Sequence, residues 1–118
     1  SGINLIGNTS IRFTSKNFQG GDGTSIIGDT HINLSEIDFP PGEKTIRLTN
    51  IIGDIHITLP KDFAVKARGN AIIGKIKIYD EIEDGFFRNV FYRSDNYSEQ
   101  EKRLHIDVSS IIGDIFLT

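Results

Sequence analysis

The sequence predicts an all-β domain in which short strands stack as the rungs of a β-solenoid, a β-helix-like fold, with a β-sandwich of short strands as the alternative. Two observations lead to this prediction. A motif built on Ile-Ile-Gly-Asp recurs along the chain with a period of about 20–25 residues, which is typical of solenoid repeats. Each copy is followed by alternating apolar and polar residues, the pattern of a strand with one buried face.

The repeated motif predicts the corners of the stack. Five segments align on one glycine, and in four of them an Asp or Asn follows that glycine. Glycine accepts a positive φ without a Cβ clash, so we expect the chain to turn there. An Asp or Asn side chain accepts hydrogen bonds from nearby backbone amides and would cap such a turn. The predicted corner residues are Gly7, Gly28, Asp29, Gly53, Asp54, Gly74, Gly113 and Asp114.

Strands are predicted on both sides of each corner. After Gly53, Ile55 and Ile57 alternate with polar residues, whereas Ile46 and Leu48 before it share the opposite phase. A bend or bulge at the glycine would produce this shift. In a stack, the isoleucines that precede the glycines lie over one another, and we expect them to fill one dry core. This column comprises Ile6, Ile27, Ile52, Ile73 and Ile112.

Composition excludes several classes of function. The 118 residues carry a formal net charge of −3, with no cysteine and no methionine. We expect one domain over residues 1–118. Without cysteine there is no disulfide or thiolate chemistry, and without a run of Lys and Arg there is no footprint of a nucleic-acid binder. No apolar stretch is long enough to span a membrane. We interpret the chain as a soluble piece of a longer protein, whose membrane region would lie outside it.

No catalytic, cofactor or metal site is predicted. Residues 69–75 match the start of a phosphate-binding loop, but Ile76 stands where that loop needs Ser or Thr. The aspartates after the glycines would suit calcium only in much shorter repeats, so we interpret them as caps. His31 and His56 are equivalent in two repeats and could hold zinc with these aspartates, but we interpret them as a solvated ladder. No nucleophile, base and orienting residue occur at a recognisable spacing.

Residues 81–101 interrupt the repeat and form the candidate binding surface. The segment begins acidic and continues as Phe-Phe-Arg-Asn-Val-Phe-Tyr-Arg over 86–93, which is apolar at both parities. Such a strand is either buried on both faces or offered to a partner. Two interpretations stay open. The segment covers an edge of the stack, or it binds a partner protein through Phe87, Phe91, Tyr92 and Arg93, residue types that are common in interface cores.

The repeat and the interrupting segment together resemble the C-terminal domain of the LiaF family, the VraT-like cell-wall-active antibiotic response proteins of Gram-positive bacteria. The resemblance covers residues from about 24 to the end. Two departures are Lys75, where the family usually has an acidic residue, and Phe87, where a polar residue is common. The matching segments are 51–60, 85–90, 94–97, 102–106 and 110–114.

This resemblance implies a parent protein with N-terminal membrane helices, located at the cell membrane. It also implies a regulator that restrains the sensor histidine kinase of an envelope-stress two-component system, with no catalytic residues. The alternative is a ligand-sensing module that binds a carbohydrate, a lipid or a peptide antibiotic. In either case the open ends of a solenoid could pair two copies as a homodimer.

Overall fold

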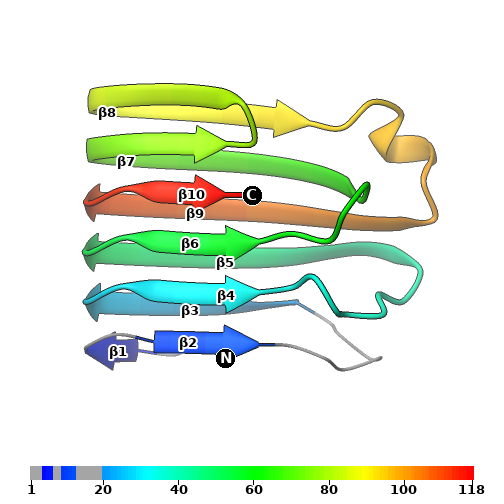
Figure 1. Cartoon of the computed structure of the whole chain (residues 1–118), viewed down its shortest axis with the longest axis horizontal. Coiled ribbons are helices and arrows are strands. Elements are labelled where there is room, and N and C mark those ends of the chain that lie inside the picture. Colours follow the sequence, from blue (N-terminus) through cyan, green and yellow to red (C-terminus); the bar gives the residue numbers. More distant parts are fainter. Residues whose placement is uncertain (1–3, 7–8, 13–19) are drawn as a thin grey trace.

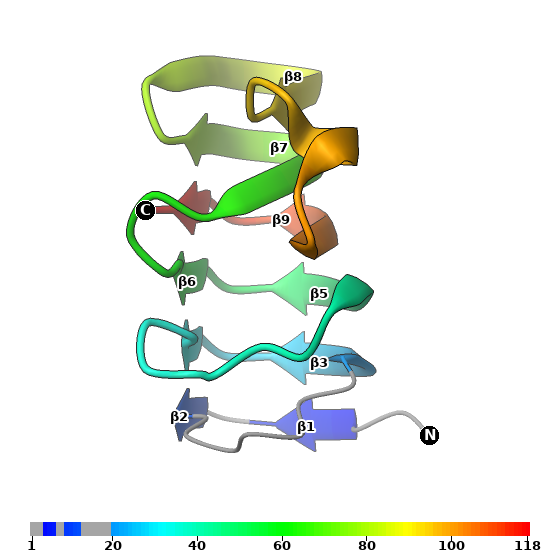
Figure 2. The same ribbon diagram turned by 90° about the vertical axis from the view of Figure 1, so that its right-hand side faces the viewer.

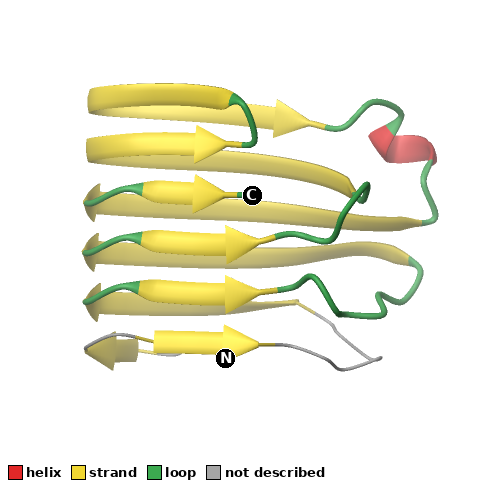
Figure 3. Cartoon of the chain, in the orientation of Figure 1, coloured by secondary structure: helices red, strands yellow, loops and turns green. Residues whose placement is uncertain are grey.

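Strands of one continuous sheet form most of the part of the chain that the structure describes (Figure 3). This computed structural model describes the backbone of residues 4–6, 9–12 and 20–118, and the side chains from residue 27 onward. In chain order, the elements are β1 (Asn4–Ile6), β2 (Thr9–Arg12), β3 (Gly20–Ile27), β4 (Thr30–Asn33), β5 (Gly42–Ile52), β6 (Ile55–Thr58), β7 (Ala64–Ile78), β8 (Glu81–Arg93), the 3-10 helix η1 (Tyr97–Glu99), β9 (Lys102–Ile112) and β10 (Ile115–Leu117).

In the rungs β3–β4, β5–β6 and β9–β10, a long strand is followed by a corner and a shorter strand that runs back (Figures 1 and 2). The long wall contains β1, β3, β5, β9 and the first part of β7, all parallel. The short wall contains β2, β4, β6, β10 and the last part of β7, also parallel. The predicted β-solenoid-like stack is therefore confirmed.

The rungs do not follow the order of the chain. The last rung, β9–β10, lies between β5–β6 and β7, because β9 pairs with both β5 and β7 while β10 pairs with both β6 and β7. β8 runs back antiparallel along β7 and ends the stack. η1 and its flanking loops then carry the chain back past β7 (Figure 2). The interrupting segment 81–101 thus connects β7 to β9 and allows the final rung, β9–β10, to lie between β5–β6 and β7.

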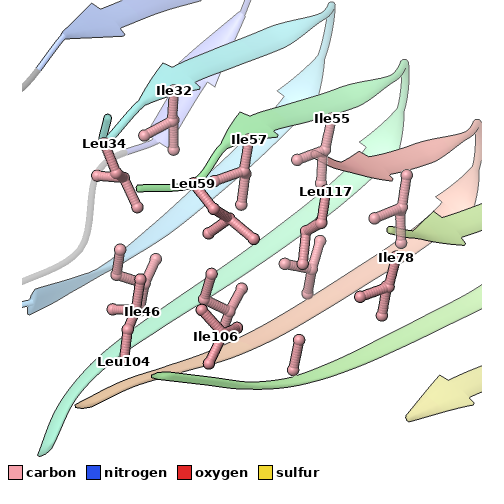
Figure 4. Close-up of a cluster of buried hydrophobic side chains, with 14 of the residues drawn as sticks. Ile32, Leu34, Ile46, Ile55, Ile57, Leu59, Ile78, Leu104, Ile106 and Leu117 are labelled. Carbon is pink, nitrogen blue, oxygen red and sulfur yellow. The ribbon is translucent and has the colours of Figure 1, made fainter. Parts of the chain in front are cut away.

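The core lies between the two walls. Figure 4 shows Ile57 and Leu59 of the short-wall side facing Ile46, Leu104 and Ile106 of the long wall. Burying an aliphatic side chain of this size contributes about 1.5–3 kcal/mol relative to leaving it exposed. The fully buried aliphatic side chains in the described part of the chain are Leu34, Ile55, Ile57, Val65, Ile76, Ile78, Leu104, Ile106, Val108, Ile115 and Leu117.

The expected column of isoleucines exists, but the prediction that it is buried is wrong. Ile27 pairs with Ile52, Ile52 with Ile112, and Ile112 with Ile73 in the parallel register. Their side chains are nevertheless 42–48% exposed. In β5, β9 and β7 the inward phase ends two residues earlier, at Asn50, Ser110 and Ala71, which are 0–3% exposed. The chain then turns, so the column projects from the outside of the corner. Ile6 pairs with Ile27 in the backbone, and its side chain lies outside the described residues.

Candidate functional site

Four glycines form the corners of successive rungs. Gly28, Gly53, Gly74 and Gly113 all have positive φ, between 122° and 150°. They also stack closely, since a Cβ at Gly53 would collide with the carbonyl group of Gly28, one at Gly113 with that of Gly53, and one at Gly74 with that of Gly113. Only glycine fits both constraints. Gly7 lies outside the described residues.

The aspartates that follow these glycines connect neighbouring rungs. Asp54 N–H donates to Asp29 Oδ1 at 2.9 Å, Asp114 N–H to Asp54 Oδ1 at 2.8 Å, and Lys75 N–H to Asp114 Oδ1 at 2.8 Å. Each carboxylate therefore accepts a bond from the backbone of the next rung in space. Hydrogen bonds to a charged acceptor are stronger than neutral ones, so this relay holds the corners in register. Lys75 occupies the end of the relay and only donates to it.

On this rigid support lies an apolar surface that we call the corner ridge. It crosses four rungs and continues onto β8, where Phe86 lies opposite Ile73. With strands about 4.8 Å apart, the ridge extends for about 19 Å from Ile27 to Phe86. Its side chains are between 39% and 77% exposed. A contiguous exposed apolar surface usually marks an interaction site. The ridge consists of Ile27, Ile52, Ile72, Ile73, Ile111, Ile112, Phe86 and Phe87.

The sequence contained a signal for this ridge that the burial prediction missed. The apolar phase shifts by one residue across Gly53, and adjacent residues of a strand point to opposite faces, so the two isoleucines before this glycine cannot both point inward. A residue pair placed where the phase changes belongs to the bend. At a sharp bend, side chains project to the outside.

The four residues proposed as a partner surface on β8 divide into two pairs. Phe87 and Phe91 are 77% and 62% exposed. Tyr92 instead packs against Tyr79, with ring centroids 4.8 Å apart. Arg93 is held within the chain, because its guanidinium donates to Ser98 Oγ at 2.6 Å and lies over a tyrosine ring in η1. Phe87 and Phe91 are therefore available to a partner, whereas Tyr92 and Arg93 already have intramolecular contacts.

A buried tyrosine fastens the connection that follows β8. Tyr97 O–H donates to Glu43 Oε2 at 2.8 Å, and Lys66 Nζ lies 3.6 Å from the same carboxylate. Burial and this hydrogen bond raise the pKa of Tyr97 well above its ordinary value. The same bond lowers the pKa of Glu43. These contacts join β5, β7 and η1, so they fix the connection between β8 and the last rung.

The two histidines singled out in the sequence belong to an outward aromatic ladder. The rings of His31 and His56 stack at 4.6 Å, and His56 stacks on Phe116 at 4.8 Å. The strand β10 lies between β6 and β7, so Phe116 pairs with His56 on one side and with Lys77, the equivalent residue of the β7 rung, on the other. In the part of the chain that the structure describes, no three His, Cys, Asp or Glu side chains gather where one metal ion could be held. The ladder is a stacked surface of the short wall.

The fold defines a class of protein, a β-solenoid-like stack of parallel strands, and comparison with known proteins gives the family. Residues 5–117 match the family described as cell wall-active antibiotics response LiaF, C-terminal. The chain belongs to this LiaF family, one of regulatory proteins with no known catalytic activity. The resemblance inferred from the motifs is thus confirmed, and the match begins well before residue 24.

One relative shows the extent of the similarity. The chain is 34% identical over 92 residues to Protein LiaF of Bacillus subtilis strain 168, an alignment that covers 78% of this chain and 38% of LiaF. The chain therefore spans well under half the length of that relative. Among the described residues, no helix has the length and apolar character needed to cross a membrane.

A solved structure supports the fold independently. A proposed cell adhesion protein from Clostridium sporogenes ATCC 15579 superimposes with a TM-score of 0.64 at 12% sequence identity. The match covers 98% of this chain and 90% of the other. At this low identity the similarity concerns the architecture of stacked strands alone.

Proposed function

We propose that this domain regulates a cell-envelope stress response by binding the sensor histidine kinase of a two-component system, without catalysing a reaction itself. The observation that supports this function is the corner ridge. A regulator needs a persistent surface that a partner can recognise, and the ridge is apolar, exposed and held by a backbone that cannot easily move. Membership of the LiaF family supports the cell-wall antibiotic response as the setting.

The geometry of the ridge suits a protein partner. Its isoleucine and phenylalanine side chains project from consecutive rungs, so a complementary surface could bury several of them together. Anchors of this kind often dominate binding, while surrounding polar groups set orientation. Asp54 and Asp114 flank the ridge on the short-wall side, and they would favour a partner with basic residues beside an apolar stripe. Phe87 ends the ridge, and Phe91 on the long wall is a second contact candidate.

In the parent protein, membrane segments outside this chain would place the domain beside a membrane-bound kinase. This arrangement raises the effective concentration of the two partners, so that even a modest ridge affinity would suffice. The same argument gives localisation at the cell membrane as part of the proposal. The response regulator would then be affected through the kinase.

The proposal is tested by titrating the purified chain against the cognate full-length kinase in lipid nanodiscs. We expect binding by the wild-type chain, and at least tenfold weaker binding by an Ile52→Ser/Ile112→Ser double variant. Both side chains are 45% exposed on adjacent strands, so the variant should stay folded. Tenfold corresponds to about 1.4 kcal/mol, within the range of one lost hydrophobic anchor.

Thr49→Ala is the matched control, because Thr49 is exposed on the same β5 strand but outside the ridge. It should bind as the wild type does. Phe87→Ala and Phe91→Ala then show whether the contact continues onto β8. A wild-type chain that does not bind the kinase would contradict the proposed function. Equal binding by the ridge double variant would exclude the ridge as the contact surface.

A further inference from the structure

Phe87 is both strained and exposed. Its φ of 53° lies in the left-handed region, and it has no partner in the β7–β8 register. Three other described residues besides glycine have a positive φ: Asp62 and Asn96 are of types that tolerate it, and Tyr79 packs against Tyr92. Phe87 is 77% exposed, so neither backbone preference nor burial explains a phenylalanine at this bend. Strained residues of this kind cluster at functional sites.

Two further phenylalanines project near this bend. Phe86 is 67% exposed and Phe91 is 62% exposed, so these and Phe87 are the most exposed large apolar residues among the side chains that the structure describes. All three belong to β8, the strand that ends the stack (Figure 1). Phe91 lies on the outer face of the long wall, because the neighbouring Val90 is buried and points inward. The long-wall end of the stack therefore presents projecting aromatic rings.

The same end of the stack is basic. The long-wall part of β7, residues 64–73, has two basic residues and no acidic one. Residues 86–93 of β8 add two arginines, again without an acidic residue, although the whole chain has a net charge of −3. Arg68 is exposed opposite Phe91, and the first acidic neighbour across the sheet is Asp107 on β9. Basic side chains thus accompany the aromatic rings on the last two strands of the long wall.

This combination matches an anionic lipid surface. Aromatic side chains are favoured at the membrane–water interface, and each Lys or Arg close to an anionic bilayer adds electrostatic attraction. Projecting rings can enter the head-group layer without a preformed groove, whereas a protein partner would need a pocket for each ring. The acidic half of β8 lies on the short wall, beyond the turn at Gly85, so it would not face the same lipid surface.

We therefore infer that the long-wall end of the stack docks on an anionic membrane surface. Phe87 and Phe91 enter the head-group layer, while Arg68 and Arg88 lie beside lipid phosphates. The left-handed backbone at Phe87 holds its ring away from the stack, which gives the strain a purpose. The inference rests on the membrane setting of the proposed function and adds a lipid contact to it. The isoleucine part of the corner ridge stays free for a protein partner.

Co-sedimentation of the purified chain with lipid vesicles, without any kinase, is the first test. We expect binding to vesicles of phosphatidylglycerol and phosphatidylcholine in equal parts, and at least tenfold weaker binding to phosphatidylcholine alone or at high salt. Arg68→Glu should weaken binding to the anionic vesicles about tenfold or more. Lys61→Glu is the matched control, because Lys61 is exposed in the loop between β6 and β7 and the net charge changes equally. It should bind as the wild type does.

Phe87→Asn separates the lipid contact from stability. Asparagine tolerates the left-handed backbone, so this variant should resist urea as well as the wild type or better. It should nevertheless bind anionic vesicles at least fivefold more weakly, because an exposed ring that enters the lipid is lost. Ile82→Asn is the control, since Ile82 is 55% exposed on the acidic half of the same strand and should not touch lipid. Unchanged binding by Phe87→Asn overturns the insertion of this ring.

Fluorescence gives a second readout. The chain has no tryptophan, so Phe87→Trp places a single reporter at the bend. Its emission should shift to the blue when anionic vesicles are added, and that of Ile82→Trp should not. A chain that does not bind anionic vesicles at low salt, or a bound Phe87→Trp chain with unshifted emission, overturns the inference.

Empty nanodiscs of the same lipid separate this inference from the proposed function. A chain that binds the kinase but neither empty nanodiscs nor vesicles contradicts the lipid contact alone. A chain that binds empty and kinase-loaded nanodiscs equally contradicts the kinase contact alone. If Phe87→Asn weakens kinase binding while the wild-type chain binds no lipid, the aromatic end belongs to a protein interface and the lipid inference is wrong.

Discussion

The molecule contains two populations of isoleucine that differ in their surroundings although they come from the same repeats. Ile55, Ile57 and Ile115, directly after the corners, are 0–1% exposed. Ile52 and Ile112, directly before the corners, are both 45% exposed. Only two residues, Gly53 and Asp54, separate Ile52 from Ile55. For isoleucines this close to a corner, burial therefore depends on the position relative to the bend, since the residue type is the same in both populations.

The boundary between the two populations is a polar position. Asn50 and Ser110 pair in register and are fully or almost fully buried at the inner side of the corner. Beyond them the backbone turns through the glycine, so the following side chains point outward. The ridge is thus a consequence of the corner geometry that the glycine and aspartate columns impose. Its apolar character is not needed for the core, which suggests a role in binding.

The largest expected difference between the two populations is in stability. Ile57→Ala should lower the free energy of unfolding by about 2–5 kcal/mol, because it leaves a cavity in the core. Ile52→Ala should cost less than about 1 kcal/mol, because its side chain is half in solvent already. Urea denaturation followed by circular dichroism measures both. Equal losses would mean that the ridge is buried in solution, for example by self-association.

The corner glycines permit a comparison of two positive-φ positions. Gly53→Ala should destabilise the domain by about 3 kcal/mol or more, because strained backbone and a collision with the Gly28 carbonyl act together. Gly42 also has a positive φ, but a Cβ there would meet no atom within 4 Å. Gly42→Ala should therefore show the backbone strain alone, about 1–2 kcal/mol. Thermal unfolding of both variants separates strain from stacking, and equal effects would argue against close stacking of the corners.

The aspartate relay is expected to contribute less than the glycines. Asp54→Ala removes the acceptor for Asp114 N–H, and the loss should be about 1–2 kcal/mol. Asp54→Asn keeps an oxygen acceptor and should recover most of it. Chemical denaturation at pH 7 gives both values. If the Asn variant were as unstable as the Ala variant, the carboxylate charge, and not the hydrogen bond, would be the stabilising feature.

Much of the fold was predictable because its signals are local. The glycine–aspartate corners and the alternation after them follow from backbone preferences within a few residues of Gly53 or Gly113. Two features could not be predicted in this way. The insertion of β9–β10 between β6 and β7 depends on pairing between distant segments, which similar repeats permit in several orders. The exposure of Ile52 and Ile112 depends on where the wall ends. On β8, the sequence named Phe87 and Phe91 among four candidate contacts without deciding between exposure and burial, and both their exposure and the packing of Tyr92 against Tyr79 required the structure.

The smallest predicted effect concerns the buried polar position that precedes the corner, occupied by Ser110 in β9. Ser110 is 3% exposed, and its hydroxyl has no hydrogen-bond partner in the described part of the structure. Leaving a buried hydroxyl unpaired has a free-energy cost, so Ser110→Ala should leave stability unchanged or raise it by up to about 1 kcal/mol. The next rung already uses alanine at the equivalent position, since Ala71 pairs with Ser110 and is 3% exposed. Small residues therefore fit at this corner.

The measurement is urea denaturation of wild type, Ser110→Ala and Ser110→Val. The valine variant adds volume at the same place and should be less stable than the alanine variant, because the corner has close neighbours on both sides. Loss of more than about 1 kcal/mol in Ser110→Ala would contradict the prediction. It would mean that the hydroxyl has a partner in solution, such as an ordered water shared with Asn50, whose amide group is also buried without a partner. The inner corner would then be held by a polar contact, and the division between buried and exposed isoleucines would rest on that contact as well as on the glycine turn.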